Sequence, residues 1–208
     1  MEITKTILIG GGQHAQVVLD CLLASGVDVV AIFDPARSGT LFGVAFRGEY
    51  DASFDASSRA IVAIGDNKTR KRASERISHP FTSAIHHSVL LSPSVTIGVG
   101  NMILHGSIVQ ALARIGNHVI INTGAQVDHD CVIGDYVHVA PRAVLCGSVT
   151  VGEGTLIGAG ATITPGVKIG NWALVGAGAV IIEDVPDYAV VVGNPGRIIR
   201  YATAPTLS

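Results

Sequence analysis

The chain has 208 residues, of which 48% are hydrophobic and 14% charged, and its formal net charge is −2. This balance gives no electrostatic footprint for nucleic acid, no apolar run reaches the roughly 18 residues that span a bilayer, and residues 1–12 lack the features of a secretory signal. We expect a cytoplasmic protein of one large or two small domains, without a disulfide framework because its three cysteines follow no pattern.

The N-terminal region alternates between short apolar runs and helix-prone stretches. Ile7–Ile9 is predicted to be a buried strand, followed by a glycine turn at 10–12 and an apolar periodic stretch typical of a helix. Further strands are expected at Val29–Phe33 and Ile61–Ile64, and a basic helix over Lys68–Ile77 follows the last of them. This order predicts a βαβ unit, in which free N–H groups at a helix N-terminus receive an anionic group. The expected ligand therefore carries phosphate.

The glycine turn also fits a dinucleotide-binding fingerprint. Gly10, Gly12 and Ala15 have the required spacing, and Asp34 follows the second predicted strand. Length argues against NAD, because only about half of a dinucleotide fold fits before residue 85. Hydride transfer would also need a substrate domain, which the remainder of the chain does not resemble. A nucleotide attached to another group is the better prediction.

A strict period of six residues begins at Ile85 and continues without an insertion. Seventeen consecutive blocks open with an aliphatic residue, namely Ile85, Leu91, Ile97, Ile103, Val109, Ile115, Ile121, Val127, Ile133, Val139, Leu145, Val151, Ile157, Ile163, Ile169, Val175 and Ile181. A unit this short cannot bury its own apolar face, so it must stack on copies of itself. We predict an all-β parallel β-helix with three blocks per turn over 83–208, preceded by a half-Rossmann-like α/β domain over 1–82.

Two local features of the repeat carry further expectations. Glycine follows the aliphatic opener in seven blocks, and we expect these glycines to supply the unusual backbone angles of the bends. The coil is expected to end at Val185–Asp187, because a proline lies there and the composition of the tail then changes.

Six motifs distributed along the chain resemble one enzyme family. They are Gly10–His14, Ile64–Asn67, Ala84–His86, Asn122–Gly124, Asp128–Cys131 and Val192–Gly196. Together they resemble the bacterial nucleotide-sugar N-acetyltransferases with hexapeptide repeats, most of all those acting on GDP-perosamine, with sialic acid O-acetyltransferases as relatives. The resemblance implies a left-handed β-helix, a homotrimer with active sites between neighbouring prisms, and acetyl transfer from acetyl-CoA to the 4-amino group of a nucleotide-linked sugar. It would place the protein in lipopolysaccharide O-antigen biosynthesis.

The resemblance also assigns roles to residues. His129 would be the general base, a task suited to histidine near neutral pH, and Asp130 would raise its basicity. The sugar nucleotide would contact Gly10, Gly11, Gly12, Gln13, His14, Asp34, Pro35, Gly65, Asp66 and Asn122. Acetyl-CoA would contact His138, Gly147, Ala159, Ala177, Pro195 and Arg197. Simpler interpretations stay open: strand-end caps for Asp34 and Asp66, turn residues for Asn122 and Asp130, and a solvated basic tail for Arg197.

The eighteen-residue stacking adds geometry to these roles. His129 occupies the third position of its block, between two inward positions, so its side chain should point outward. Gly147 should lie one coil above it, leaving space and a backbone N–H for a thioester oxygen. Ile157–Ala161 should stack under Val175–Ala179 as a smooth column of glycine and alanine. This column would form a groove for a pantetheine arm, unless small residues merely fit the corners.

The sequence predicts direct transfer of acetyl to the acceptor in a ternary complex. No side chain looks like an acyl-accepting nucleophile, since Cys131 should face inward, and Cys146 is the remaining candidate. An O-acetyltransferase of the sialic acid type and a non-catalytic β-solenoid binding module are the two alternative functions. His87 and His105 should stack, but two ligands without Cys, Asp or Glu in register do not make a zinc site, so we expect no metal.

Overall fold

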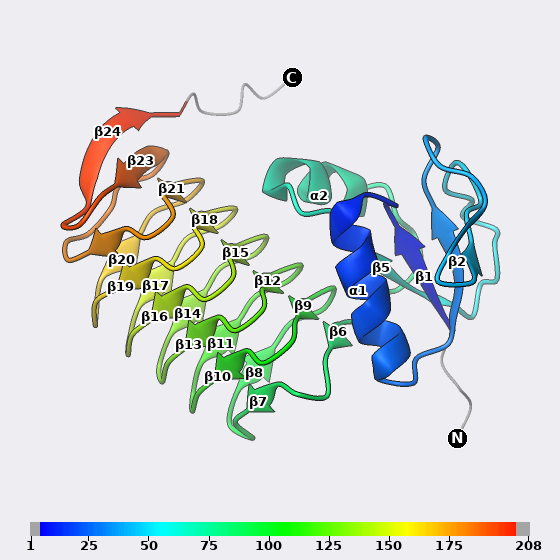
Figure 1. Ribbon diagram of the computed structural model, residues 1–208, viewed down its shortest axis with the longest axis horizontal. Helices are drawn as coiled ribbons and strands as arrows, with labels where there is room; N and C mark the ends of the chain where they lie inside the picture. Colours follow the sequence, from blue (N-terminus) through cyan, green and yellow to red (C-terminus); the bar gives the residue numbers. More distant parts are fainter. Residues whose placement is uncertain (1–4, 203–208) are drawn as a thin grey trace.

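The structure, a computed structural model, describes residues 5–202 and consists of a small α/β part followed by a long prism (Figure 1). The α/β part contains β1 (Thr6–Ile9), α1 (Gln13–Ala24), β2 (Val29–Phe33), β3 (Thr40–Leu41), β4 (Val44–Ala45), β5 (Arg59–Val62) and α2 (Asn67–Ser74). Its parallel sheet has the order β2-β1-β5, which confirms the predicted βαβ unit. β5 begins at Arg59 rather than Ile61, because Arg59 already pairs with Thr6. No helix within residues 5–202 is long and apolar enough to cross a membrane.

The prism has three faces of short parallel strands, one per block (Figure 1). The first face contains β6 (Ala84–Ile85), β9 (Met102–Ile103), β12 (Ile120–Ile121), β15 (His138–Val139), β18 (Leu156–Ile157) and β21 (Leu174–Val175). The second contains β7 (Leu90–Leu91), β10 (Ile108–Val109), β13 (Gln126–Val127), β16 (Val144–Leu145), β19 (Thr162–Ile163) and β22 (Val180–Ile181). The third contains β8 (Thr96–Ile97), β11 (Arg114–Ile115), β14 (Val132–Ile133), β17 (Thr150–Val151) and β20 (Lys168–Ile169). From β6 to β19 each strand pairs with the strand eighteen residues later, as Ile120 does with His138, so the prediction of three blocks per turn is confirmed.

The block openers form the core of the prism. From Ile103 to Ile181 every opener is at most 5% exposed, and the small fifth-position residues, such as Ala125 and Cys131, are fully buried. Ile85 and Leu91, which open blocks of the first coil, are each 37% exposed. They lie at the end of the stack and have a coil on one side only. The core is therefore one column of apolar side chains, which the three faces of the repeat enclose without a second layer of secondary structure.

The glycines that follow the openers serve the close approach of successive coils. A Cβ at Gly134 would lie 2.9 Å from the backbone nitrogen of Glu153, and a Cβ at Gly152 would lie 2.7 Å from that of Asn171. Positive φ angles occur instead two positions later in the block, as at Gly124, whose φ is 65°. The expectation that the first set of glycines supplies unusual backbone angles is wrong. Each coil needs a residue without a side chain because the next coil's backbone occupies that space.

Gly152→Ala is expected to destabilise the prism by about 1–3 kcal/mol, as overpacking of a well-packed interior does. The added Cβ would meet backbone atoms of Gly170 and Asn171 at 2.7 Å, and backbone atoms have no rotamer to escape into. Thermal unfolding followed by circular dichroism measures the effect. Lys168→Ala, an exposed position on the same face, is the control and should stay within about 0.5 kcal/mol of the parent. A Gly152→Ala protein that melts with the parent would contradict this packing argument.

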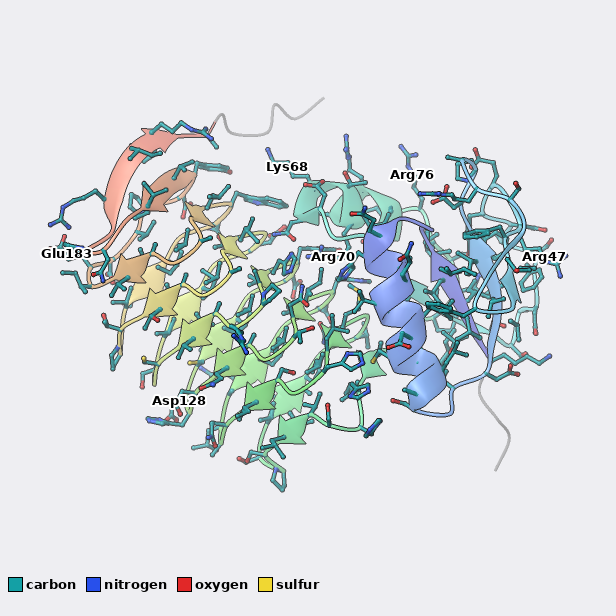
Figure 2. The ribbon with its side chains drawn as sticks, viewed as in Figure 1. Arg47, Lys68, Arg70, Arg76, Asp128 and Glu183 are labelled. Carbon is teal, nitrogen blue, oxygen red and sulfur yellow. The ribbon has the colours of Figure 1, made fainter. Side chains whose placement is uncertain are left out.

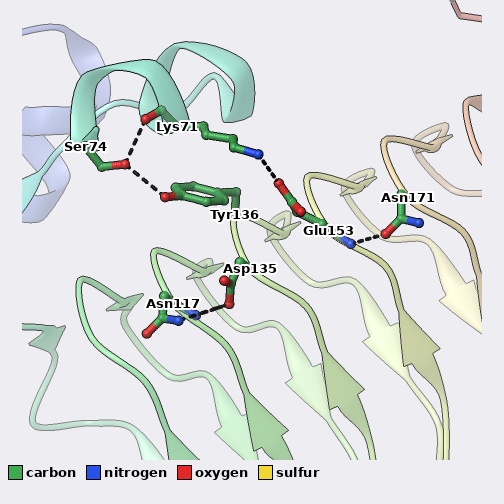
Figure 3. Close-up of polar contacts among 7 residues, drawn as sticks. All are labelled: Lys71, Ser74, Asn117, Asp135, Tyr136, Glu153 and Asn171. Atoms are coloured by element: carbon green, nitrogen blue, oxygen red, sulfur yellow. Dashed lines mark hydrogen bonds and ion pairs between the residues drawn. The ribbon is translucent and has the colours of Figure 1, made fainter. Parts of the chain in front are cut away.

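A ladder of polar side chains follows the corner between the third and first faces (Figure 3). Asp135 Oδ1 accepts a hydrogen bond from the backbone N–H of Asn117 at 2.7 Å, and Asn171 Oδ1 accepts one from Glu153 N–H at 2.9 Å. The ladder thereby satisfies backbone donors of the preceding coil at the bend. The Glu153 side chain leaves the ladder and binds the Lys71 ammonium of α2 at 2.5 Å.

The prism continues beyond Val185–Asp187, so the predicted end of the coil is wrong. β23 (Ala189–Val192) joins the first face, with Val190 paired to Leu174 sixteen residues earlier. β24 (Arg197–Tyr201) then turns back antiparallel to β23. The proline does not end the coil because this last turn is shorter and Asp187 takes the ladder position, accepting from Asn171 N–H at 2.7 Å. Residues 203–208 of the expected tail lie outside the described residues.

Both helices of the α/β part dock on the prism. Val18 and Leu22 of α1 share an apolar cluster with Met102 and Ile120 on the first face. α2 lies along the corner between the third and first faces (Figures 1 and 3). The first face and this corner therefore fix where the α/β part sits.

The corner under α2 carries an aromatic column with one gap. The His118 and Tyr136 rings stack with centroids 5.2 Å apart, and Trp172 stands in the same position two coils beyond Tyr136. Gly154 occupies the intervening coil, and the Trp172 ring leans over it so closely that a Cβ there would collide. The Lys71 ammonium fills this region, 5.7 Å from the ring centroids of both Tyr136 and Trp172. α2 is thus held by cation–π contacts as well as by its ion pair.

Candidate functional site

The turn between β1 and α1 has the conformation expected of a phosphate-binding turn. Gly10 follows β1 with a φ of 98°, an angle that residues with a Cβ rarely adopt. Gly11 N–H donates to Asp34 Oδ2 at 2.6 Å, and Asp34 Oδ1 accepts from Ala36 N–H at 2.9 Å. The Asp34 carboxylate therefore caps the end of β2 and holds the glycine turn against it. Sequence reasoning left the capping role open, and the geometry shows it.

The space over the N-terminus of α1 is open. Gly12 is the N-cap residue, no side chain caps the helix, and a Cβ at Gly12 would meet nothing within 4 Å. Gln13 and Pro35 are both exposed beside this space. The first N–H groups of a helix are unsatisfied within the helix and favour negative charge. This end of α1 can therefore accept a phosphate or diphosphate group.

Four residues that are distant in the sequence meet where β5 ends against the first face. The rings of His14 and His138 have centroids 6.2 Å apart, and a Cβ at Gly65 would lie 3.6 Å from the His14 side chain. His138 Nε2 lies 3.1 Å from Asn122 Nδ2, which can donate to it. We call His14, Gly65, Asn122 and His138 the junction cluster. His138, which the resemblance assigned to acetyl-CoA, thus adjoins residues assigned to the sugar nucleotide.

Burial determines the charge of the two junction histidines. Desolvation, aided by the nearby Arg70 charge, lowers the pKa of His14 to about 4 and that of His138 to about 3. Both imidazoles are therefore neutral at physiological pH. His14 Nε2 is buried without a hydrogen-bond partner among residues 5–202. Since buried polar atoms are nearly always satisfied, an unpaired ring nitrogen here calls for a partner from outside the chain.

Asp66 caps α2 in the structure. Its Oδ1 accepts from Thr69 N–H at 2.8 Å, and hydrogen bonding to Thr69 lowers the pKa of the carboxyl group. Asp66 also lines a pocket of about 240 Å³ between α2 and the first face. The other lining residues are Gly65, Asn67, Lys68, His138, Gly154, Leu156, Trp172, Ala173, Leu174, Tyr188, Val190, Arg200 and Ala202. Its apolar wall, with Lys68 and Arg200 among the lining residues, suits a ligand that is partly apolar and partly anionic.

The predicted general base lies on a different corner, between the second and third faces. His129 Nδ1 is 2.8 Å from Asp130 Oδ2, and their side chains are 57% and 50% exposed. The hydrogen bond to Asp130, together with the charge of Asp128, raises the pKa of His129. A Cβ at Gly147 would lie 2.6 Å from the His129 ring, which confirms that the glycine lies directly over the imidazole. We call His129, Asp130 and Gly147 the corner cluster.

The corner cluster and the junction cluster do not meet within one chain. Figure 2 shows Asp128, next to His129, on the side of the prism away from Arg70 and α2. The two histidines belong to different faces of a rigid coil, since His129 follows β13 of the second face and His138 begins β15 of the first. The structure therefore presents two separate clusters of candidate site residues.

The glycine and alanine column is present on the corner between the first and second faces. Gly178 N–H donates to the Ala159 carbonyl at 2.9 Å, and Ala177 stands directly above Ala159. Pro195 lies in the turn between β23 and β24, and Arg197 begins β24. The Arg197 side chain lines a separate pocket with Glu183 and Asp184, whereas Arg200 lines the pocket beside His138.

Several residues at the junction escaped sequence reasoning. Arg70 was part of a predicted basic helix, and Trp172 and Tyr188 were not singled out, although both line the larger pocket. A signal was available for the aromatic residues, because His118, Tyr136 and Trp172 share the fourth position of blocks on one corner. No comparable signal distinguishes Arg70 from its neighbours.

A second group of histidines lies near α1. The His86 ring stacks on His105 with a centroid distance of 3.7 Å and lies 4.0 Å from His87, so His86 intervenes between the pair predicted to stack. His105 Nε2 is 3.4 Å from Asp20 Oδ2. Within residues 5–202 no group of three or more His, Cys, Asp or Glu side chains has the arrangement of a metal site.

Two family descriptions match the two parts of the chain. Residues 5–77 match the PglD N-terminal domain, and residues 112–147 and 148–183 each match the bacterial transferase hexapeptide, described as six repeats. A protein of Acanthamoeba polyphaga mimivirus described as uncharacterized is 32% identical over 117 residues. That match covers 55% of this chain and 24% of the viral protein, so the chain spans about a quarter of that relative.

Solved structures match nearly the whole chain. PerB from Caulobacter crescentus, crystallised with CoA and GDP-perosamine, is 40% identical, covers 94% of this chain and 97% of its own, and superposes with a TM-score of 0.86. The same perosamine N-acetyltransferase was also crystallised with one histidine replaced by asparagine or by alanine. The acetyltransferase domain of PglB from Neisseria gonorrhoeae, in complex with acetyl coenzyme A, is 33% identical, covers 94% and 98% of the two chains, and has a TM-score of 0.89.

Proposed function

Since the chain belongs to the hexapeptide-repeat nucleotide-sugar N-acetyltransferases, we propose that it transfers acetyl from acetyl-CoA to the 4-amino group of a nucleotide-linked 4-amino-4,6-dideoxy sugar. GDP-perosamine is the acceptor we favour. The observation that carries the proposal is the match to PerB over 94% of this chain, which extends over both the α/β part and the left-handed β-helix. The α/β part supplies an anion-binding helix end, and the prism supplies a histidine with raised basicity.

The proposal includes a homotrimer, because one chain holds only half-sites. A general base must come within about 2.6–3.2 Å of the proton that it removes, directly or through one water. His129 is on another corner from His14 and His138, and the rigid prism keeps them apart. A neighbouring copy would therefore bring its corner cluster to the junction cluster of this chain. The large exposed fractions of the His129 and Asp130 side chains support this arrangement, since both are free to meet a partner.

The chemistry assigned to the joined half-sites is direct attack. The sugar diphosphate would bind over the N-terminus of α1, with His14 Nε2 turned toward the ligand. His129 Nδ1 is engaged by Asp130, which leaves Nε2 to accept the amine proton as nitrogen attacks the thioester carbonyl. The Gly147 backbone N–H would stabilise the developing oxyanion, and the column of Ala159 and Ala177 would hold the pantetheine arm.

An acceptor screen tests the function. GDP-, UDP- and dTDP-linked 4-amino sugars are offered with acetyl-CoA, and free thiol release is recorded with sialic acid acceptors in parallel. We expect turnover with an amino sugar on one nucleobase. Turnover with the hydroxyl acceptors alone would instead identify an O-acetyltransferase. If calorimetry detected no coenzyme A binding, a non-catalytic solenoid would replace the enzyme.

Asp130→Asn is expected to move the acidic limb of the pH profile of kcat/KM to lower pH. His129 must be neutral to act as a base, so activity rises with pH through the pKa of His129. The Asp130 hydrogen bond raises that pKa, and its loss lets the value fall toward that of an ordinary histidine. The variant should also be slower at its plateau, because a weaker base removes the proton less readily. An unshifted acidic limb, measured from pH 5 to pH 9, would remove Asp130 from the mechanism.

A further inference from the structure

Arg70 is a buried cation without an ion-pair partner. It lies on α2 (Figure 2). Its side chain is fully buried, and among residues 5–202 no carboxylate forms an ion pair with it. The nearest acidic influence is Asp66, which caps the same helix. Burying an unpaired charge is costly, and such a group persists where its hydrogen bonds are complete and its position serves a purpose.

Three hydrogen bonds connect the Arg70 guanidinium to residues of the α/β part. Nη1 donates to the carbonyl oxygens of Ile64 at 3.0 Å and Gly65 at 3.1 Å, and Nη2 donates to Asn67 Oδ1 at 2.8 Å. Ile64 and Gly65 form the turn that carries Gly65 into the junction cluster. The guanidinium therefore determines where that turn lies.

The remaining donors of Arg70 reach the prism. Nε donates to the His118 carbonyl at 2.9 Å, and Nη2 donates to the Tyr136 carbonyl at 2.7 Å. Asn67, which accepts from Arg70, also donates to the Gly154 carbonyl at 3.0 Å. One planar side chain thus joins the turn of Ile64 and Gly65 to successive coils of the prism. Lysine could not replace it, because three donors on a flexible stem cannot match the five of a rigid fork.

The Arg70 charge also acts on the junction histidines. Along with burial, it lowers the pKa of His14 and His138. Asn122 can donate to His138 Nε2 only if that nitrogen carries no proton. Lys68 and Arg200 line the pocket beside His138 and add positive charge, whereas Asp66, the acidic residue of that lining, is already engaged as a helix cap.

We propose that Arg70 is a positioning residue, which locks the Gly65 turn onto the prism and so sets His14 and His138 against the bound sugar nucleotide. This inference rests on the proposed function for the identity of the ligand. A second consequence follows from the charge: Arg70 adds to the effect of burial in keeping both imidazoles neutral, so that His14 Nε2 and the His138–Asn122 pair act as hydrogen-bonding groups rather than as cations. The unpaired charge also favours an anionic ligand above the turn.

Two substitutions separate the geometric effect from the electrostatic one. Arg70→Lys keeps the charge and loses most of the hydrogen bonds, so we expect KM for the sugar nucleotide to rise more than tenfold while KM for acetyl-CoA stays within about twofold. The histidine pKa values should remain low in this variant. Arg70→Met loses both the charge and the hydrogen bonds, and NMR titration should show the pKa values of His14 and His138 rising but staying below that of an ordinary histidine, because burial is the larger cause of their lowering. Arg72→Met, an exposed arginine on the same helix, is the matched control.

Further measurements keep the inference testable if an Arg70 variant does not fold. In the wild-type protein, His14 and His138 should titrate below about pH 5, and titration near 6.5 would overturn the electrostatic role. Asn67→Ala removes one of the oxygens that accept a hydrogen bond from Arg70. It should raise KM for the sugar nucleotide, as Arg70→Lys does, but by a smaller factor. Wild-type KM in Arg70→Lys would overturn the geometric role. Calorimetry with GDP and with UDP separates the role of Arg70 from the proposed enzymatic function. If His14 and His138 have low pKa values but neither nucleotide binds, only the proposed function is contradicted.

Discussion

His129→Ala is expected to lower kcat by about 10²–10⁴-fold, the usual contribution of a general base, with little change in KM for either substrate. The imidazole is 57% exposed on a corner and hydrogen-bonds to Asp130, so removing it should leave the fold and both binding regions unchanged. Its contribution arises as the amine loses its proton. A loss confined to kcat is the signature of an interaction made only in the transition state. Initial rates of thiol release, measured against each substrate, test this.

His87→Ala is the control for this experiment. It also replaces an exposed histidine of the prism, but one outside both clusters, and it should retain wild-type turnover. His129→Asn should be as impaired as His129→Ala, because an amide hydrogen-bonds but is not a base. Near wild-type turnover in either His129 variant would exclude the histidine as the base and leave proton removal to another group.

Gly147→Val is expected to lower kcat about 10²-fold, the cost of a misplacement of roughly 1 Å at a reacting group. A Cβ at this position would lie 2.6 Å from His129 Cε1 and Nε2, so the imidazole must swing away from the groove. The contact is with the end of a mobile side chain rather than with backbone. The melting temperature should therefore change little, in contrast to Gly152→Ala.

Ala111→Val is the matched control, because Ala111 lies on the same corner one coil below His129 and is exposed. It adds similar bulk on the side of His129 opposite to Gly147. Comparing kcat and melting temperature for the two valine variants separates crowding of His129 from general strain. If Gly147→Val retained full kcat, the space over the imidazole would have no catalytic role.

The repeat allowed more of the prism to be predicted than of the junction. Six-residue periodicity fixes which residues stack, because every strand from β6 to β19 pairs with the one eighteen residues later. The relation of His129 to Gly147 and that of Ala159 to Ala177 follow from this rule alone. The period does not indicate why a given residue type occupies a given position. For this reason the sequence pattern suggested that the glycines after the openers form bends, whereas they allow successive coils to pack closely.

The junction depends on docking, which a single sequence does not display. Arg70 stands in a run of basic residues, a pattern that usually indicates a solvated helix face. Arg70 is buried because α2 packs against the column of aromatic rings on the prism. The helix fits there because Gly154, far along the chain, leaves a gap in that column. His14 likewise meets His138 because of the way in which α1 packs on the first face. These contacts follow from tertiary structure and from no local pattern.

The stacking period also restricts how the length of this molecule can change. An insertion of eighteen residues after Ile163, between Ala159 and Ala177, would add one coil and leave every face in alignment, with Ala177 still in the column that contains Ala159. An insertion of six would turn every later residue to the next face and remove Ala177 from that column. The distance between the junction histidines and the C-terminal hairpin can therefore change only in whole coils of about 4.8 Å, and so can the length of ligand that the groove accommodates.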